Sequence, residues 1–118
     1  MIALLTTAAL AASVLTSGPA ALALAPAFSN TVVSTYPDGR QARLWLNRDG
    51  GYRATGRRGK PSSGTWSLKG GKVCLKQRKP IAAPITFCAP YKSGGVGTRW
   101  TGKAVTGETI QIALVAGR

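Results

Sequence analysis

Few residues in this sequence could do chemistry: it has two cysteines, three acids and sixteen basic residues, and it lacks histidine. Histidine is the commonest general base and metal ligand in proteins. Asp38, Asp49 and Glu108 each stand beside a glycine in a predicted turn, so no carboxylate pair or metal-ligand cluster is indicated. Ser62 and Ser63 are predicted to lie in a flexible loop rather than in a Ser–Lys catalytic pair. The sequence therefore predicts a protein that is not an enzyme and uses no metal or cofactor.

The two cysteines, Cys74 and Cys88, are predicted to form a disulfide bond. Disulfides persist in oxidising compartments outside the cytosol. A bridge between them closes a loop of 15 residues, and in the chain-entropy model such a loop is worth about 3 kcal/mol. Two free buried thiols or a redox pair are the alternatives, although the C-x-x-C spacing usual for a redox pair is missing.

Basic charge is the strongest functional signal. The formal net charge is +13 and the isoelectric point is about 11.0, so the surface should attract polyanions in a salt-dependent way. We expect anionic envelope polymers or lipid headgroups as partners, and nucleic acid only if the protein is not exported. The alternative is that the cations merely solvate turns and outer strand faces. The candidate anion-binding residues are Arg57, Arg58, Lys60, Lys72, Lys76, Arg78 and Lys79.

Trp45 is a candidate stacking residue. It alternates with Gln41, Arg43 and Asn47, which places it on the polar face of its strand by period. An exposed indole between basic and amide groups could stack on a sugar or a base. The alternative is that strand twist or a bulge turns this side chain inward.

Residues 1–27 are predicted to be a secretory signal peptide that forms an apolar leader helix. The run has no charged side chain, is rich in Ala and Leu, and ends in Ala25-Pro26-Ala27, which fits the A-x-A pattern of a cleavage site. The n-region lacks Lys and Arg, and an uncleaved membrane anchor is the alternative. Cleavage after Ala27 leaves one domain, residues 28–118, in the periplasm or outside the cell.

Short β-rich runs separated by glycine and proline fill the rest of the chain. Asp38-Gly39, Asp49-Gly50, Gly70-Gly71 and Gly107-Glu108 are predicted hairpin turns, because glycine supplies the positive φ that such turns need. This spacing predicts an all-β, up-and-down antiparallel meander that forms a small barrel, with a two-sheet sandwich as the alternative. The predicted strands are 31–36, 41–47, 52–57, 64–69, 72–77, 85–91, 99–106 and 109–116.

Alternation along these strands predicts which side chains form the core. Val73 and Leu75 should point inward from one strand, and Ile85 and Phe87 from the strand paired with it. Three further pairs are predicted to point inward: Trp66 with Leu68, Trp100 with Ala104, and Leu44 with Leu46. If Cys74 faces Cys88, residue 72 faces residue 90 and residue 76 faces residue 86. The disulfide would then lie on the outer face beside Lys72 and Lys76, as part of a rigid basic patch.

The run GTWSLKGGKVCLK (64–76) resembles small exported bacterial β-barrels of the lipocalin-like, or calycin-like, type. The resemblance covers about residues 50–91 and implies a calycin-like fold with an interior cavity, but it carries over no catalytic residues. The leading hypothesis is an exported, non-enzymatic cell-envelope protein that associates with anionic envelope components. A carrier of a small apolar ligand and an inhibitor or partner of another secreted protein are the alternatives, and the oligomeric state is open.

Overall fold

The computed structural model describes residues 23–118, which form eight strands after a short 3₁₀ helix, η1 (Ala25–Ser29). The predicted leader helix falls mostly on residues 1–22, outside this part of the chain. Among residues 23–118, no helix is long and apolar enough to cross a membrane. The strands are β1 (Thr31–Thr35), β2 (Gln41–Leu46), β3 (Gly51–Thr55), β4 (Pro61–Lys69), β5 (Lys72–Lys79), β6 (Phe87–Pro90), β7 (Arg99–Lys103) and β8 (Thr109–Val115).

Glycine turns set the strand order, as the sequence predicts. Gly39, Gly50 and Gly107 have φ of 86°, 94° and 94°, and Gly70 and Gly71 have φ of 53° and 77°. Glycine adopts this left-handed region readily, whereas residues with side chains rarely do. The glycines therefore allow the chain to reverse direction at these points. All four predicted hairpin turns are therefore confirmed.

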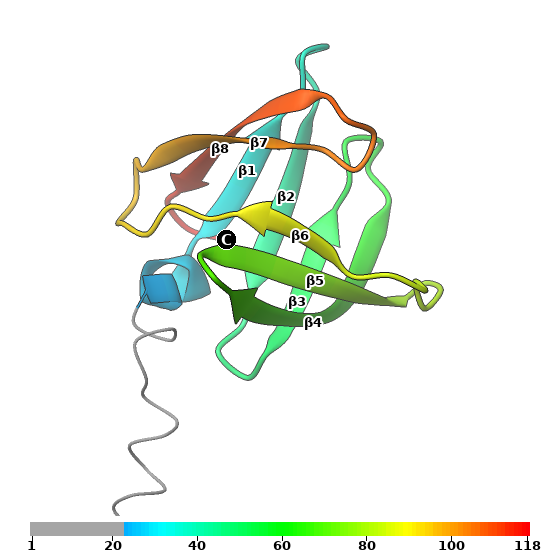
Figure 1. Cartoon of the computed structure of the whole chain (residues 1–118). Helices are drawn as coiled ribbons and strands as arrows, with labels where there is room; N and C mark the ends of the chain where they lie inside the picture. The colour runs from blue at the N-terminus through cyan, green and yellow to red at the C-terminus, as the bar shows by residue number, and fades with distance from the viewer. Residues whose placement is uncertain (1–22) are drawn as a thin grey trace, which may run out of the picture.

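The strands form one antiparallel sheet, in the order β6-β5-β4-β3-β2-β1-β8-β7, that curls into a nearly closed barrel (Figure 1). Pro90 has no N–H to donate across the seam between β6 and β7. Side chains bridge the seam instead. The Trp100 Nε1–H donates to the Pro90 carbonyl at 2.9 Å, and the Tyr91 and Trp100 rings meet edge to face at 5.1 Å. The predicted meander barrel is thus confirmed in preference to the sandwich.

The segment before β1 closes one end of the barrel. Leu24 and Ala27 have no exposed surface and belong to the same buried cluster as Leu46, Tyr52 and Leu114. Phe28 packs on Trp66, with ring centroids 5.8 Å apart. Leu24 and Ala27 belong to the predicted leader, residues 1–27, whose cleavage after Ala27 stays a prediction. Cleavage there would remove two residues of the core.

Arg118 fastens this closed end by hydrogen bonds to the segments around it. Its guanidinium donates to the Asn47 Oδ1 at 2.9 Å, to the Ala27 carbonyl at 3.1 Å and to the Leu46 carbonyl. The Asn30 side chain donates to the Pro26 carbonyl at 2.7 Å and accepts from the Gly117 N–H at 2.9 Å. The plug, defined here as Leu24–Asn30, is therefore held by both packing and polar contacts.

Two local predictions are wrong. Ile85 is 74% exposed and precedes β6, because the strand begins only at Phe87, after a proline-containing loop. Ser62 and Ser63 lie in β4 rather than in a loop, paired with Ala54 and Arg53 of β3. Pro61 opens β4, and proline is tolerated as the first residue of a strand, so it did not delay this one.

Candidate functional site: the barrel cavity and its mouth

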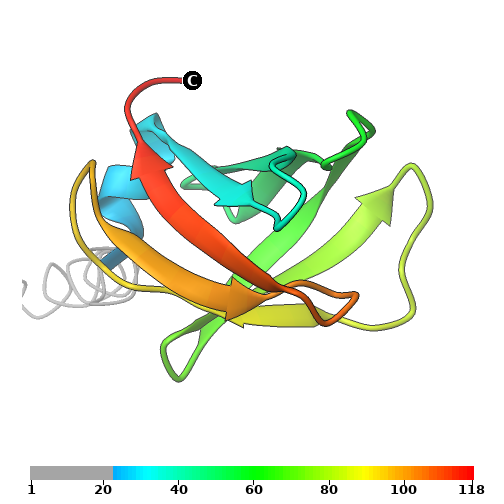
Figure 2. The ribbon, with the colours of Figure 1, turned by 90° about the horizontal axis from the view of Figure 1, so that it is seen from above.

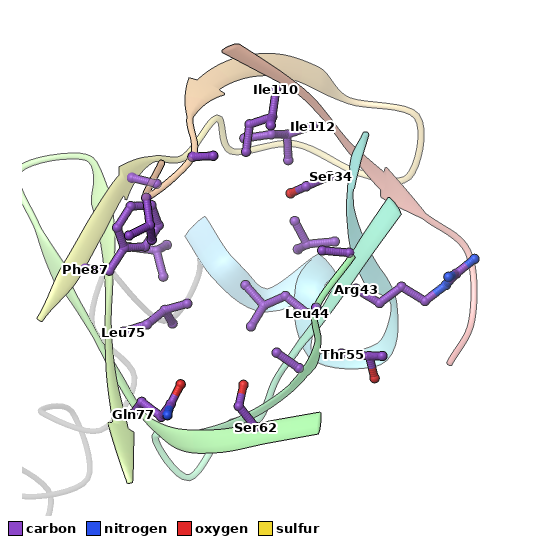
Figure 3. Close-up of a pocket in the computed structure, with 18 of the residues that line it drawn as sticks. Ser34, Arg43, Leu44, Thr55, Ser62, Leu75, Gln77, Phe87, Ile110 and Ile112 are labelled. Carbon is purple, nitrogen blue, oxygen red and sulfur yellow. The ribbon is translucent and has the colours of Figure 1, made fainter. Parts of the chain in front are cut away.

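The barrel contains a cavity of about 480 Å³, within the range of small-molecule pockets. Its wall is largely apolar, with Leu44, Leu75, Phe87, Ile110 and Ile112 pointing inward (Figure 3). Ser34, Ser62 and Gln77 also line the cavity. These three residues lie toward the end of the barrel opposite the plug. The cavity is therefore mostly apolar, with a few polar groups in the half nearer the open end.

Strand alternation produces this lining. Leu44 points inward, whereas its neighbour Arg43, which also borders the cavity, directs its side chain outward (Figure 3). Arg43 is paired with Thr55, and Leu44 with Ala54, which also lines the cavity. Leu75 and Phe87 face each other across the β5–β6 ladder. The predicted inward direction of Leu44, Leu75 and Phe87 is confirmed. Strand alternation does not predict that these side chains line a cavity, which only the lipocalin-like resemblance implies.

Four connections form the open end, which we call the mouth. They are the turns at 36–40, 56–60 and 104–108 and the loop at 80–86, and they gather at the end away from η1 (Figure 2). Tyr36, Lys60, Pro80 and Val105 from these segments line the cavity. A ligand entering the barrel at this end passes between them.

Five of the seven predicted anion-binding residues lie at the mouth, and one of them, Arg57, is engaged in an ion pair. Arg58 and Lys60 lie in the β3–β4 turn, while Arg78 and Lys79 end β5, and all four are exposed. The pairing of Ser63 with Lys79 brings these two segments to the same end of the sheet. Within residues 23–118 the two ion pairs use Arg40 and Arg57, so these four cations are not neutralised by carboxylates.

The other two predicted cations, Lys72 and Lys76, lie away from the mouth. Lys72 follows the Gly70-Gly71 turn at the closed end, and Lys76 pairs with Thr65 in the middle of β5. The disulfide between Cys74 and Cys88 is present in the predicted register, with Lys72 opposite Pro90. Cys74 is only 1% exposed, whereas Cys88 is exposed. Lys72 and the mouth cations are thus at opposite ends of β5, so the seven candidates do not share one surface, and a basic patch of Lys72 and Lys76 beside the disulfide stays a prediction.

Arg57 is a structural latch across one side of the mouth. Its Nη1 lies 2.8 Å from the Glu108 Oε2, and its guanidinium carbon is 4.4 Å from the centroid of the Tyr36 ring. Tyr36, Arg57 and Glu108 come from three different turns. Hydrogen bonds from the Thr106 hydroxyl and from Arg57 lower the pKa of Glu108. The latch therefore fixes the turn that carries Arg58 and Lys60 relative to the two neighbouring turns.

The latch predicts an acid-sensitive contribution to stability. Because the folded-state pKa of Glu108 is lowered, its stabilisation is present above the ordinary glutamate pKa of about 4.3 and is lost as pH falls through the lower folded value. We expect the Tm difference between wild type and Glu108→Gln to be constant near neutral pH and to shrink below about pH 4. Thermal melts across this range measure it. A difference that persists unchanged at low pH would contradict the latch.

Trp45 lies on the outer face, as its alternation predicts, and is half-buried. Its indole N–H donates to the Thr31 Oγ1 at 2.9 Å, and the Arg53 guanidinium carbon lies 5.3 Å from its ring centroid. Trp45, Arg53, Ser63 and Lys79 line a second, shallower hollow of about 350 Å³. Arg53 thus already covers part of the indole, and stacking of a ligand on Trp45 stays a prediction.

Tyr91 is a cavity residue that sequence reasoning did not single out. Its hydroxyl is buried without a hydrogen-bond partner in the described part of the chain, and burial raises its pKa. The Tyr91 N–H donates to the Gly71 carbonyl, which places the residue near the closed end. A neutral phenol here offers one hydrogen bond to a polar ligand atom deep in the cavity. Nothing in the sequence around Tyr91, which directly follows the last residue of β6, indicates that its hydroxyl is buried in a cavity.

No protein-family model, curated protein or solved structure matches this chain, so the function is argued from the cavity and its mouth.

Proposed function

We propose that the protein binds a small amphiphilic anion, with its apolar part inside the barrel and its acidic group at the mouth. The observation that carries this proposal is a cavity of about 480 Å³ with an apolar interior that opens among uncompensated cations. Binding, not catalysis, is the proposed activity. The three acids support this view, because Asp38 and Asp49 accept backbone N–H bonds within their turns and Glu108 holds the latch.

The chemistry of the wall favours an acyl chain or a similarly apolar body. Burying apolar ligand surface against Leu44, Leu75 and Ile112 is favourable at about 25 cal/mol per Å². Ser62 and Gln77 offer polar contacts nearer the opening, and Lys60 adds a positive charge at the rim. A carboxylate or phosphate gains most from that rim, because charge-assisted hydrogen bonds are the stronger ones.

Export and lipocalin-like kinship are parts of the same proposal. The Cys74–Cys88 bridge suits an oxidising compartment, and a nearly closed meander barrel suits a calycin-like fold. In that setting the protein would carry or sequester an anionic lipid or fatty acid of the cell envelope.

Titration with parinaric acid, a fluorescent fatty acid, tests the proposal. We expect saturable binding by wild type, and weaker binding of the uncharged methyl ester because it lacks the acidic group. Leu75→Trp places an indole inside the cavity and should weaken fatty-acid binding at least about tenfold, since it takes the volume that the ligand needs. Val115→Trp adds the same side chain on β8 at the closed end, where Val115 is 44% exposed, and serves as the matched control.

Two outcomes would contradict the proposal. One is the absence of saturable binding by folded wild-type protein. The other is equal affinity of wild type and Leu75→Trp, which would place the fatty acid outside the barrel. Circular dichroism of each variant confirms that the barrel is intact.

A further inference from the structure

Three large apolar side chains at the mouth are exposed. Ile81 and Ile85, in the loop between β5 and β6, are 75% and 74% exposed, and Val105, in the β7–β8 turn, is 78% exposed. Val105 also lines the opening of the cavity. The two segments lie at the same end of the barrel (Figure 2). Three such side chains at one end of a small domain are more than the scattered single residues expected on a soluble surface.

The same end carries the uncompensated cations. Arg78 and Lys79 directly precede the loop that holds Ile81 and Ile85, and Arg58 and Lys60 lie in the neighbouring turn. An apolar tip surrounded by cations is the surface chemistry of proteins that rest on anionic membranes. Cations there meet lipid phosphates while the apolar tips enter the boundary between headgroups and acyl chains.

We propose that the mouth is a docking surface for an anionic lipid bilayer. Ile81, Ile85 and Val105 enter the interfacial layer, and Arg58, Lys60, Arg78 and Lys79 contact the headgroups. A soluble polyanion would use the cations but leave the apolar side chains without a partner, so a bilayer fits both observations. The inference goes beyond ligand binding, because docking needs the rim and not the cavity. Docking in this orientation points the cavity opening at the lipid.

Co-sedimentation with vesicles tests the docking. We expect wild type to bind vesicles of phosphatidylcholine with one quarter phosphatidylglycerol and to release them as salt is raised. Pure phosphatidylcholine vesicles should bind far less. Each cation near an anionic surface is worth about a fivefold change in partitioning, so Arg58→Gln with Lys79→Gln should weaken binding about 25-fold.

The closed end supplies matched controls. Lys69→Gln with Lys72→Gln removes the same charge beside the Gly70-Gly71 turn and should weaken binding much less. Ile81→Ser with Ile85→Ser should weaken binding, whereas Val96→Ser should not, since Val96 is 55% exposed in the loop at the opposite end. All of these positions are exposed, so folding should be retained.

Three results would overturn the docking surface. The first is the absence of anionic-vesicle binding by wild type. The second is an equal loss from the two charge pairs, which would show attraction without orientation. The third is unchanged binding by the double isoleucine variant. Parinaric acid titration of wild type and of Ile81→Ser with Ile85→Ser separates the two proposals, because docking that fails while the cavity still binds the fatty acid overturns this inference alone.

Discussion

Leu24→Ala is expected to lower the free energy of unfolding by about 2–5 kcal/mol, the range for truncating a buried leucine. Leu24 has no exposed surface and packs with Leu46 and Leu114 at the closed end of the barrel. The shortened side chain leaves a void that the plug can fill only by moving away from the Arg118 and Asn30 hydrogen bonds. Urea unfolding measures the change.

Ile81→Ala is the control, because it truncates a side chain that is 75% exposed. It should change the free energy of unfolding by less than about 0.5 kcal/mol. If Leu24→Ala has an equally small effect, the plug is not part of the core.

The result also bears on where the leader is cleaved. A chain cut after Ala27 loses Leu24 and Ala27, whereas a cut after Ala23, which follows the same Ala-x-Ala spacing, leaves both in place.

Gly64→Ala is expected to destabilise the barrel by about 1–3 kcal/mol or more, through overpacking. A Cβ at this position would lie 1.9 Å from the Lys76 carbonyl oxygen and 2.9 Å from the Tyr52 Cε2. The register of β4 against β5 shifts between Ser63 and Gly64, and this irregularity brings the two backbones close together. The strands must separate to admit the methyl group.

Gly56→Ala is the matched control for this prediction. Its Cβ would meet the Lys60 carbonyl oxygen at 3.7 Å, an ordinary van der Waals contact. We expect the Tm of Gly56→Ala to stay within a few degrees of the wild-type Tm. The Tm of Gly64→Ala should fall well below the wild-type Tm. Equal melting temperatures would show that β4 and β5 are not held as close as the structure places them.

Much of the fold could be predicted from the sequence because its signals are local. Asp38-Gly39 and Asp49-Gly50 encode turns within themselves, and the pairing of Cys74 with Cys88 sets the β5–β6 register. Alternation extended back beyond Phe87 predicts that Ile85 lies in the core, but the strand has not yet begun at that position. Leu24 gives no signal of a core position in the sequence, because an apolar run before the first charge is typical of a leader.

The site was harder to predict because it depends on how the sheet closes. Inward-facing Leu44 and Leu75 give the same alternation whether the barrel is packed or hollow. Arg58 and Lys79 converge only through the pairing of β4 with β3 and β5. Lys72 and Lys79 are near one another in the sequence, but they lie at opposite ends of a strand of 8 residues.

Nuclear Overhauser contacts between a ¹³C-labelled saturated fatty acid and the methyl groups of the protein test the binding proposal most directly. We expect contacts from the acyl chain to Leu44, Leu75 and Ile112 inside the barrel, together with shifts of the Lys60 resonances at the mouth. Val115 and Val96, at the closed end, should show none. Acyl-chain contacts confined to outward-facing methyl groups, or none at all with folded protein, would contradict binding inside the cavity.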